Sequence, residues 1–202
     1  MIKNLIFDMG NVIIDIDVPR TYRAFAQMAG ISEEEATRLF HEKAFFHQFE
    51  IGKIGETDFR DLLRKEFNTS WTDEEIDAAW CELLLDMPKE RLERIEALRK
   101  NYRVFLLSNT NSIHVQEIVR RAEKHGYDFL SMFEIPFLSY EMGFMKPNPE
   151  FYRQCLQKGG LDATESIFID DNADNIEAAK TVGISTIWLN PIGSMLDKLI
   201  DY

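Results

Sequence analysis

The sequence of 202 residues contains only two cysteines and no long apolar run. Cys81 and Cys155 lie far apart and outside any metal-ligand spacing, so neither a zinc site nor a disulfide framework is indicated, and both are expected to be free, buried thiols. No apolar stretch approaches the roughly 20 residues of a membrane span. The segment MIKNLIFD reaches an acid too early for a signal peptide. The chain is therefore predicted to be cytoplasmic and to have no membrane partner.

Basic residues are also scarce, 23 against 35 acidic ones, which gives a net charge of -12. Segments such as RLERIEALRK alternate basic with acidic residues at helical spacing and indicate solvated helix faces instead of a basic patch. An acidic surface repels nucleic acid, so no nucleic-acid partner is expected. The hydrophobic content of 45% predicts an ordinary folded core.

Short apolar runs alternate with helical patterns over much of the chain. This alternation is typical of a Rossmann-like α/β fold, in which helices cover both faces of a parallel sheet. The runs predict four strands and a weaker fifth, at residues 3–8, 103–109, 166–171, 185–190 and 133–139. Helices are expected at 149–158 and over NADNIEAAKTVG.

Residues 17–89 break this rhythm, because they offer helices and no strand. Ser32 with Glu35 and Thr72 with Glu75 each fit a capping box. Apolar stripes at helical spacing predict a small bundle, over Phe59, Leu62, Leu63 and Phe67 and over Ile76, Ala79, Trp80, Leu83 and Leu84. The predicted organisation is a core domain of residues 1–16 and 90–202 and a helical cap domain of residues 17–89, inserted after the first strand.

Polar residues end three of the strong strands: Asp8, Ser108 with Asn109, and Asp170 with Asp171. In an open parallel sheet these strand ends meet at the ligand-binding edge. Attack of a carboxylate on a phosphate ester needs a hard cation such as Mg²⁺, together with donors that neutralise the remaining charge. Asp8 and Asp170 are candidate metal ligands, while Ser108, Asn109 and Lys146 are candidate phosphate donors.

The stretches FDMGNVIIDID, LLSNTN, MGFMKPNPEFY and IFIDDNADNIEAAKTVG resemble the four ordered motifs of the haloacid dehalogenase superfamily. More narrowly, they are similar to the bacterial α-D-glucose-1-phosphate phosphatase-like group. The resemblance covers essentially the whole chain. It implies that Asp8 is nucleophile and metal ligand, that Ser108 binds phosphate and that Lys146 neutralises charge. It also implies that Asp170 and the Gly10 carbonyl bind the metal and that Asp171 orients metal-bound water.

Gly10 lacks the side-chain acid that most phosphatases of this superfamily carry at that position. One hypothesis is that Asp15, or a metal-ordered water, supplies the missing proton. The alternative is that Asp15 and Asp17 cap the helix that starts around Pro19. In the cap, His47 and Gln48 are candidates for recognising a sugar, or else belong to a packed segment that ends at Gly52.

The predicted function is a Mg²⁺-dependent phosphatase for a small phosphorylated metabolite, such as glucose 1-phosphate, acting through an aspartyl-phosphate. The protein is expected to be a monomer or weak homodimer. Two alternatives remain: a metal-independent 2-haloacid dehalogenase, and a phosphate-binding pseudoenzyme, for which Gly10 is the support. The adjacent acids Asp170 and Asp171 disfavour the dehalogenase, because without a metal they would repel an anionic substrate.

Overall fold

The computed structural model describes residues 1–199, which contain one sheet of five parallel strands in the order β3-β2-β1-β4-β5. The strands are β1 Asn4–Phe7, β2 Arg103–Ser108, β3 Pro136–Leu138, β4 Ser166–Asp170 and β5 Ser185–Trp188. The predicted α/β fold is confirmed. The central strand β1 pairs with β2 on one side and β4 on the other, so these three strands end together at one edge.

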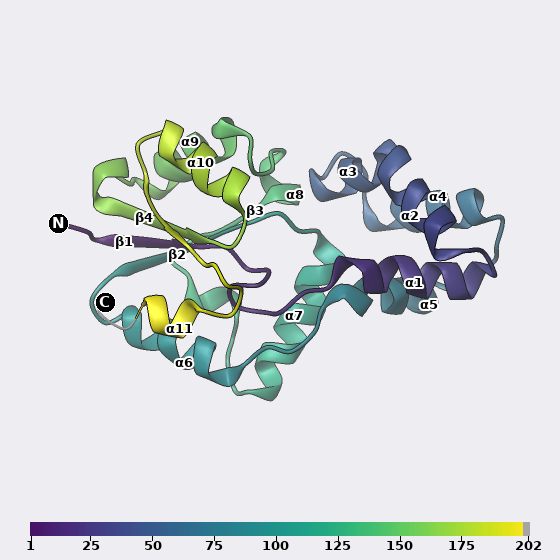
Figure 1. Cartoon of the computed structure of the whole chain (residues 1–202), viewed down its shortest axis with the longest axis horizontal. Coiled ribbons are helices and arrows are strands. Elements are labelled where there is room, and N and C mark those ends of the chain that lie inside the picture. Colours follow the sequence, from purple (N-terminus) through teal and green to yellow (C-terminus); the bar gives the residue numbers. More distant parts are fainter. Residues whose placement is uncertain (200–202) are drawn as a thin grey trace.

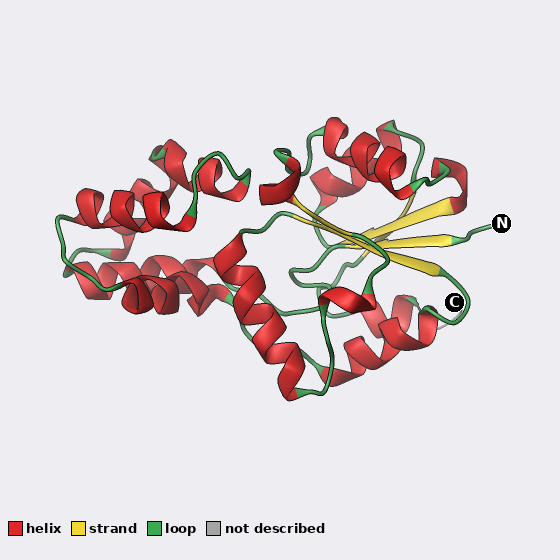
Figure 2. Cartoon of the chain, turned by 180° about the vertical axis from the view of Figure 1, so that it is seen from behind, coloured by secondary structure: helices red, strands yellow, loops and turns green. Residues whose placement is uncertain are grey.

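Helices cover both faces of the sheet (Figures 1 and 2). Successive residues of a strand face opposite sides, so Leu5 and Phe7 join one buried cluster while Ile6 joins the other. The first cluster includes residues of α6 (Lys89–Leu98), α7 (Ser112–Lys124) and α11 (Met195–Lys198). The second includes residues of α9 (Pro149–Gly159) and α10 (Ala173–Thr181). Cys155 is buried there, as expected, whereas Cys81 is only half-buried.

The weak strand expected at 133–139 is shorter than predicted. A short 3₁₀ turn, η2 (Leu130–Met132), precedes it, and only Pro136–Leu138 pairs with β2. A second 3₁₀ turn, η3 (Ala163–Glu165), leads into β4. The helices α9 and α10 begin within a residue of the predicted starts, because Asn148 and Asn172 cap their first amides.

Five helices between β1 and β2 form a separate bundle (Figure 1). They are α1 Val18–Ala29, α2 Glu33–Glu42, α3 Ala44–Glu50, α4 Glu56–Phe67 and α5 Asp73–Trp80, followed by the 3₁₀ turn η1 Cys81–Leu83. Aromatic rings fill its core: Phe49 stacks on Phe59 with ring centroids 4.2 Å apart, and Phe59 lies against Trp80. The predicted stripe residues Phe59, Leu63 and Ile76 are buried. The bundle lies where the helical insertion was predicted. Its assignment as a cap domain of residues 17–89 stays a prediction, and the bundle is called the cap below.

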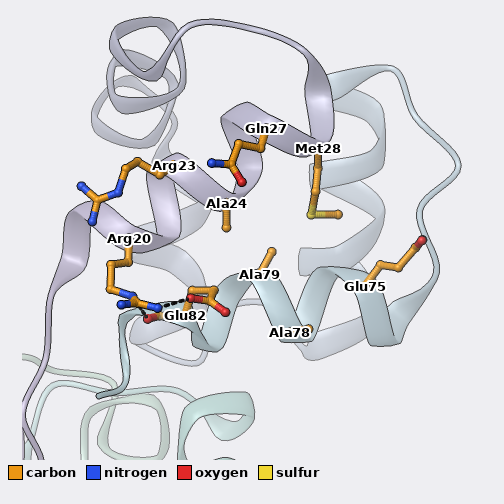
Figure 3. Close-up of a pocket in the computed structure, with 9 residues that line it drawn as sticks. All are labelled: Arg20, Arg23, Ala24, Gln27, Met28, Glu75, Ala78, Ala79 and Glu82. Atoms are coloured by element: carbon orange, nitrogen blue, oxygen red, sulfur yellow. Dashed lines mark hydrogen bonds and ion pairs between the residues drawn. The ribbon is translucent and has the colours of Figure 1, made fainter. Parts of the chain in front are cut away.

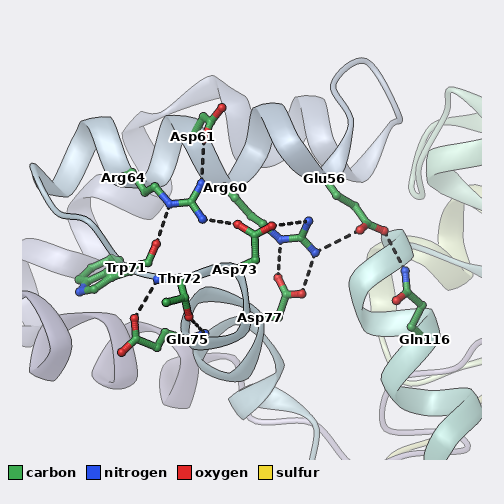
Figure 4. A network of polar contacts seen from close by, with 10 residues as sticks. All are labelled: Glu56, Arg60, Asp61, Arg64, Trp71, Thr72, Asp73, Glu75, Asp77 and Gln116. Carbon is green, nitrogen blue, oxygen red and sulfur yellow. Dashed lines mark hydrogen bonds and ion pairs between the residues drawn. The ribbon is translucent and has the colours of Figure 1, made fainter.

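Polar contacts tie α4 to α5 and to the core (Figure 4). The Arg60 guanidinium donates two hydrogen bonds to Asp77, at 2.8 and 2.7 Å, and one to Glu56. Gln116 of α7 donates to the other oxygen of Glu56, so this network crosses from the cap to the core. The capping box predicted at Thr72 is complete, whereas at Ser32 only the hydroxyl contact forms.

A second junction joins the cap to the start of α7. The Trp80 indole donates to Asn111 Oδ1 at 3.2 Å. His114 Nε2 lies 3.0 Å from the Trp80 carbonyl oxygen, which only accepts, so this nitrogen carries the proton and Nδ1 accepts from the Asn111 amide. Burial lowers the pKa of His114 to about 4. His114 is therefore a neutral core residue whose two ring nitrogens both have hydrogen-bond partners.

Candidate active site

Three chain segments bring charged side chains together at the carboxyl edge of the sheet. Asp8 directly follows β1, Asp170 ends β4, and Lys146 lies in the loop between α8 (Ser139–Met142) and α9. Lys146 Nζ is 2.6 Å from Asp8 Oδ1 and 2.8 Å from Asp170 Oδ2. All three side chains are buried. The convergence expected from the strand ends therefore exists, with the lysine ammonium bridging two carboxylates.

Burial and mutual charge set the ionisation of this cluster. Burial raises the pKa of Asp8 to about 7, and the Asp170 carboxylate adds to the rise, while Lys146 opposes it. Burial disfavours the charged form of Lys146, but the carboxylates of Asp170 and Asp8 outweigh it and leave the pKa of the lysine above its ordinary value. Lys146 is thus a fixed positive charge beside Asp8, whose ionised form burial disfavours.

Asp171 completes a group of carboxylates suited to a hard cation. One oxygen each of Asp8, Asp170 and Asp171 lies within 4.8 Å of the other two. Three carboxylates face a single ammonium, so the cluster carries excess negative charge in a buried place. Mg²⁺ prefers such oxygen ligands, and the donor set and its charge therefore fit that ion.

The neighbouring turn and helix fix Asp170. Its Oδ1 accepts from the Asn172 backbone N–H at 2.7 Å, and its Oδ2 accepts from Asn175 Nδ2 at 3.0 Å. Tyr152 in turn donates its hydroxyl to the carbonyl of Asn175. Asn175 thus supports the loop that carries Asp170. With Lys146, three donors thus hold the Asp170 carboxylate in place.

Asn11 plays a comparable part for Asp171 and was not identified from the sequence. Its Nδ2 donates to Asp171 Oδ2 at 3.0 Å, while its Oδ1 accepts from the Ile16 backbone N–H at 3.1 Å. Its φ of 56° lies in the left-handed region, which asparagine tolerates better than most residues. The Gly10-Asn11 pair, separated by one residue from the strand-end Asp8, is the sequence signal that indicates such a turn.

Asn109 holds the Lys146 loop with both ends of its amide. Its Nδ2 donates to the Lys146 carbonyl at 2.8 Å, and its Oδ1 accepts from the Lys146 N–H at 2.7 Å. The side chain predicted as a phosphate donor is thus engaged in positioning the lysine. Ser108 lies buried at the end of β2, with Oγ 3.4 Å from the Asn109 carbonyl, a long contact that leaves the hydroxyl weakly engaged.

The structure does not bring Asp15 to the cluster. Its Oδ1 accepts from Arg91 at 2.8 Å, and its main chain pairs with Leu85 and Asp86 across the neck of the cap. Asp15 does not line the cavity around Asp8. The geometry therefore contradicts its assignment as the replacement acid and gives it a role in joining the neck to α6.

The capping alternative for these acids is also wrong in detail. Asp17 occupies the N-cap position of α1 but makes no side-chain hydrogen bond to the helix amides. Its carboxylate pairs instead with Arg23, one turn into the helix, at 3.2 Å. The first turn of α1 is stabilised by Pro19 near its start, which needs no backbone donor.

A cavity of about 560 Å³ opens beside Asp8. Its lining combines the acids, the amides and the lysine described above: Asp8, Gly10, Asn11, Ile16, Asn109, Lys146, Asp171, Asn172, Ala173, Asn175 and Trp188. A slightly larger cavity, of about 600 Å³, lies between α1 and α5 of the cap (Figure 3). Both of its arginines are paired with acids, Arg20 with Glu82 and Arg23 with Asp17, and it contains no acidic cluster among the described residues. The cavity beside Asp8 is therefore the candidate active site.

Gly10 lines this cavity two residues after Asp8. Its φ is not positive, so the backbone accepts a side chain there. A Cβ atom at this position would come 2.9 Å from Cδ1 of Ile16, the far end of a flexible side chain. The missing acid is thus a feature of the sequence and not a requirement of the local fold.

Comparisons with known proteins agree with this geometry. The haloacid dehalogenase-like hydrolase family matches residues 2–183. A D-ribitol-5-phosphate phosphatase from Bacteroides thetaiotaomicron is 33% identical over 189 residues, which are 92% of this chain and 91% of that protein. A crystal structure of a HAD family enzyme from the same organism has a TM-score of 0.93 and 35% identity, and the match covers 100% of this chain and 99% of that one. A further structure of that enzyme, in complex with magnesium and inorganic phosphate, has a TM-score of 0.89 and 36% identity over 96% of each chain.

Proposed function

The chain belongs to the haloacid dehalogenase-like hydrolases, and we propose that it is a Mg²⁺-dependent phosphatase of a small phosphorylated metabolite. The observation that carries the proposal is the Lys146 ammonium held between Asp8 and Asp170, with Asp171 beside them. A dianionic phosphate cannot approach such acids unless positive charge is added. One lysine offsets part of the repulsion, and the excess of carboxylates is what a divalent cation would balance.

Asp8 is the proposed nucleophile. Its carboxylate attacks phosphorus, the bond to the ester oxygen breaks, and the resulting aspartyl-phosphate is then hydrolysed by water. Lys146 favours the ionised form of Asp8 that this attack requires, against the effect of burial. Asn109 fixes the loop that carries the lysine, and Asn11 orients Asp171. When bound by Asp8, Asp170 and Asp171, Mg²⁺ would supply the remaining positive charge.

The substrate we favour is an open-chain or cyclic sugar or polyol phosphate. The relative named D-ribitol-5-phosphate phosphatase, 33% identical along nearly the full chain, supports a pentitol phosphate ahead of glucose 1-phosphate. The relatives crystallised with magnesium and phosphate support the same class of reaction. Specificity is expected to reside in the cap, because the core contributes only groups that face the phosphate.

Hydrolysis of 4-nitrophenyl phosphate with Mg²⁺ and with EDTA tests this function. Its good leaving group makes little demand on a general acid, so the absence of an acid at Gly10 does not matter. We expect activity that EDTA abolishes and that Asp8→Asn reduces by about 1,000-fold or more. The exposed Asp58→Asn is the matched control and should keep full activity. Chloride release from a 2-haloacid without metal would instead establish the dehalogenase, and no turnover of either compound would establish a binding protein.

A further inference from the structure

The cap contacts the core through the end of α3, where Glu50 is the last helical residue. The Glu50 carbonyl accepts from Ser139 Oγ at 2.6 Å, and the same serine oxygen accepts from the Thr110 N–H at 2.9 Å. Thr110 follows Asn109, the residue that clamps Lys146. Glu50 is therefore fixed relative to the catalytic loop through a short chain of hydrogen bonds.

Gly52 allows the chain after α3 to approach the backbone of α8 closely. Its φ is 68°, and a Cβ atom there would lie 1.9 Å from the carbonyl oxygen of Tyr140, so only glycine fits against this part of α8. In the views of the whole chain, α3 faces α8 across the junction of cap and core (Figure 1). The position of the Glu50 backbone is thus set by contact and not by the end of a free helix.

The Glu50 side chain faces a cavity of about 340 Å³ at this junction. Within residues 1–199, the Glu50 carboxylate makes no hydrogen bond and no ion pair. It lies close enough to Tyr22 to raise the pKa of the Tyr22 hydroxyl, after the larger effect of burial. Burial also raises the pKa of Glu50 itself to about 7. A partly desolvated carboxyl without a partner is costly unless a ligand supplies donors.

Aromatic rings and polar side chains both line this cavity, and the polar ones include Glu42 and Lys43 beside Glu50. Phe40, Phe46, Trp80 and Tyr22 contribute rings, and His47 lies at the exposed rim. His47 was proposed from the sequence to recognise a sugar; Gln48, proposed with it, does not line the cavity. Aromatic faces suit the C–H surfaces of a carbon chain, while a carboxylate accepts from its hydroxyl groups. This combination fits a polyhydroxylated chain.

The linings of this cavity and of the candidate active site share no residue, but two chain segments contribute to both. Ile16 of the neck lines the cavity beside Asp8, and Val18 and Thr21 line the cavity beside Glu50. Asn109 lines the first and His114 the second, on the loop and helix that follow β2. A leaving group that ran from Asp8 along these two segments would reach the cavity that Glu50 lines.

We propose that Glu50, with the Tyr22 hydroxyl beside it, binds the hydroxyl groups of a polyol leaving group and so determines the substrate specificity of this enzyme. The proposal rests on the phosphatase function proposed above. It assigns the residue that selects the leaving group, which the core motifs do not. Charged hydrogen bonds of this kind are worth roughly 10- to 100-fold in binding.

The test compares D-ribitol 5-phosphate with 4-nitrophenyl phosphate for the wild type, Glu50→Gln, Glu50→Ala and Tyr22→Phe. We expect kcat/KM on the polyol ester to fall about 10-fold in Glu50→Gln and about 100-fold in Glu50→Ala. On the aryl ester all variants should stay within about 2-fold of the wild type. Glu34→Gln, an exposed acid of α2, is the control and should change neither rate.

Equal losses on both esters, or no loss on the polyol ester, would overturn the role of Glu50. A preference of the wild type for an aminoalkyl phosphate, such as ethanolamine phosphate, over the polyol ester would also overturn it, because the carboxylate would then be recognising a cation. The inhibition constant of inorganic phosphate, which occupies only the core site, should be unchanged in every variant. A wild type inactive on the aryl ester would refute the proposed function itself, and this result is distinct from the others.

Discussion

Lys146→Met is expected to destabilise the protein strongly and to abolish turnover. The wild-type ammonium lies 2.6 Å from Asp8 Oδ1 and 2.8 Å from Asp170 Oδ2, and the lysine side chain is almost wholly buried. Methionine has a similar length and keeps the packing against the ring of Phe168, whose centroid is 5.1 Å from the ammonium. The substitution therefore removes the charge with little change in volume.

The expected loss of stability follows from the acids that are left behind. Removing one partner of a buried ion pair typically costs about 3–5 kcal/mol, because the remaining charge has no compensation in a region of low dielectric. Here two carboxylates lose the same ammonium. In the variant, Asp170 still accepts hydrogen bonds from Asn172 and Asn175. Asp8 has no side-chain donor other than Lys146 within residues 1–199. We expect a loss of about 3–5 kcal/mol in EDTA, which is a large part of the stability of an ordinary domain.

Urea unfolding followed by circular dichroism measures this loss, with EDTA and with Mg²⁺. The exposed Lys100→Met controls for loss of a surface charge and should change the free energy of unfolding by less than about 0.5 kcal/mol. Added Mg²⁺ should stabilise Lys146→Met more than the wild type, because the ion then faces three carboxylates without competition from an ammonium. A loss below about 1 kcal/mol in EDTA, or an equal effect of Mg²⁺ on both proteins, would refute the reasoning.

Three further changes test other parts of the structure. The pKa of His114 is about 4 in the folded protein and 6.5 ordinarily, so between these pH values only the unfolded chain takes up the proton. The free energy of unfolding should therefore fall by up to about 3 kcal/mol as the pH falls from 6.5 to 4. Urea titrations at pH 7 and pH 5 should show a smaller pH effect in His114→Gln, and an unchanged one would contradict this account. Gly52→Ala should lower stability in thermal unfolding by about 1–3 kcal/mol more than Gly126→Ala, because both have positive φ but only the first meets Tyr140; equal losses would argue against the docking contact. Gly10→Asp should raise kcat on an alkyl phosphate at least about 10-fold while leaving the aryl ester unchanged, and a uniform loss on both would show that position 10 cannot host the acid.

The fold and the central charges could be predicted because they follow from local patterns. Apolar runs between helices predict a parallel sheet, and the acids that end those runs must then meet at one edge. The positions of Asp8, Asp170 and Lys146 confirm this reasoning. The other four strands were predicted to within two residues at each end, whereas the strand predicted at 133–139 begins three residues later, at Pro136.

The contacts that orient these residues could not be predicted, because they depend on distant parts of the chain. Asp15 looked available as an acid, but Arg91, 76 positions later, neutralises it. Asn109 looked like a phosphate donor, but the backbone of Lys146 occupies its amide. Nothing in the residues near either one signals these partners, since tertiary contacts are fixed by packing and not by sequence neighbours.

The same short segment after β2 serves the cap and the catalytic lysine. Thr110 contacts the Ser139 hydroxyl that holds the end of α3, and Asn111 contacts Trp80 of α5. Between β2 and these two residues, Asn109 clamps both backbone polar groups of Lys146. A displacement of the cap therefore acts on the loop that positions the positive charge at Asp8. The contacts of the cap and the placement of Lys146 thus depend on three consecutive residues, so we expect substrates that fill the cap cavity to gain in turnover as well as in affinity.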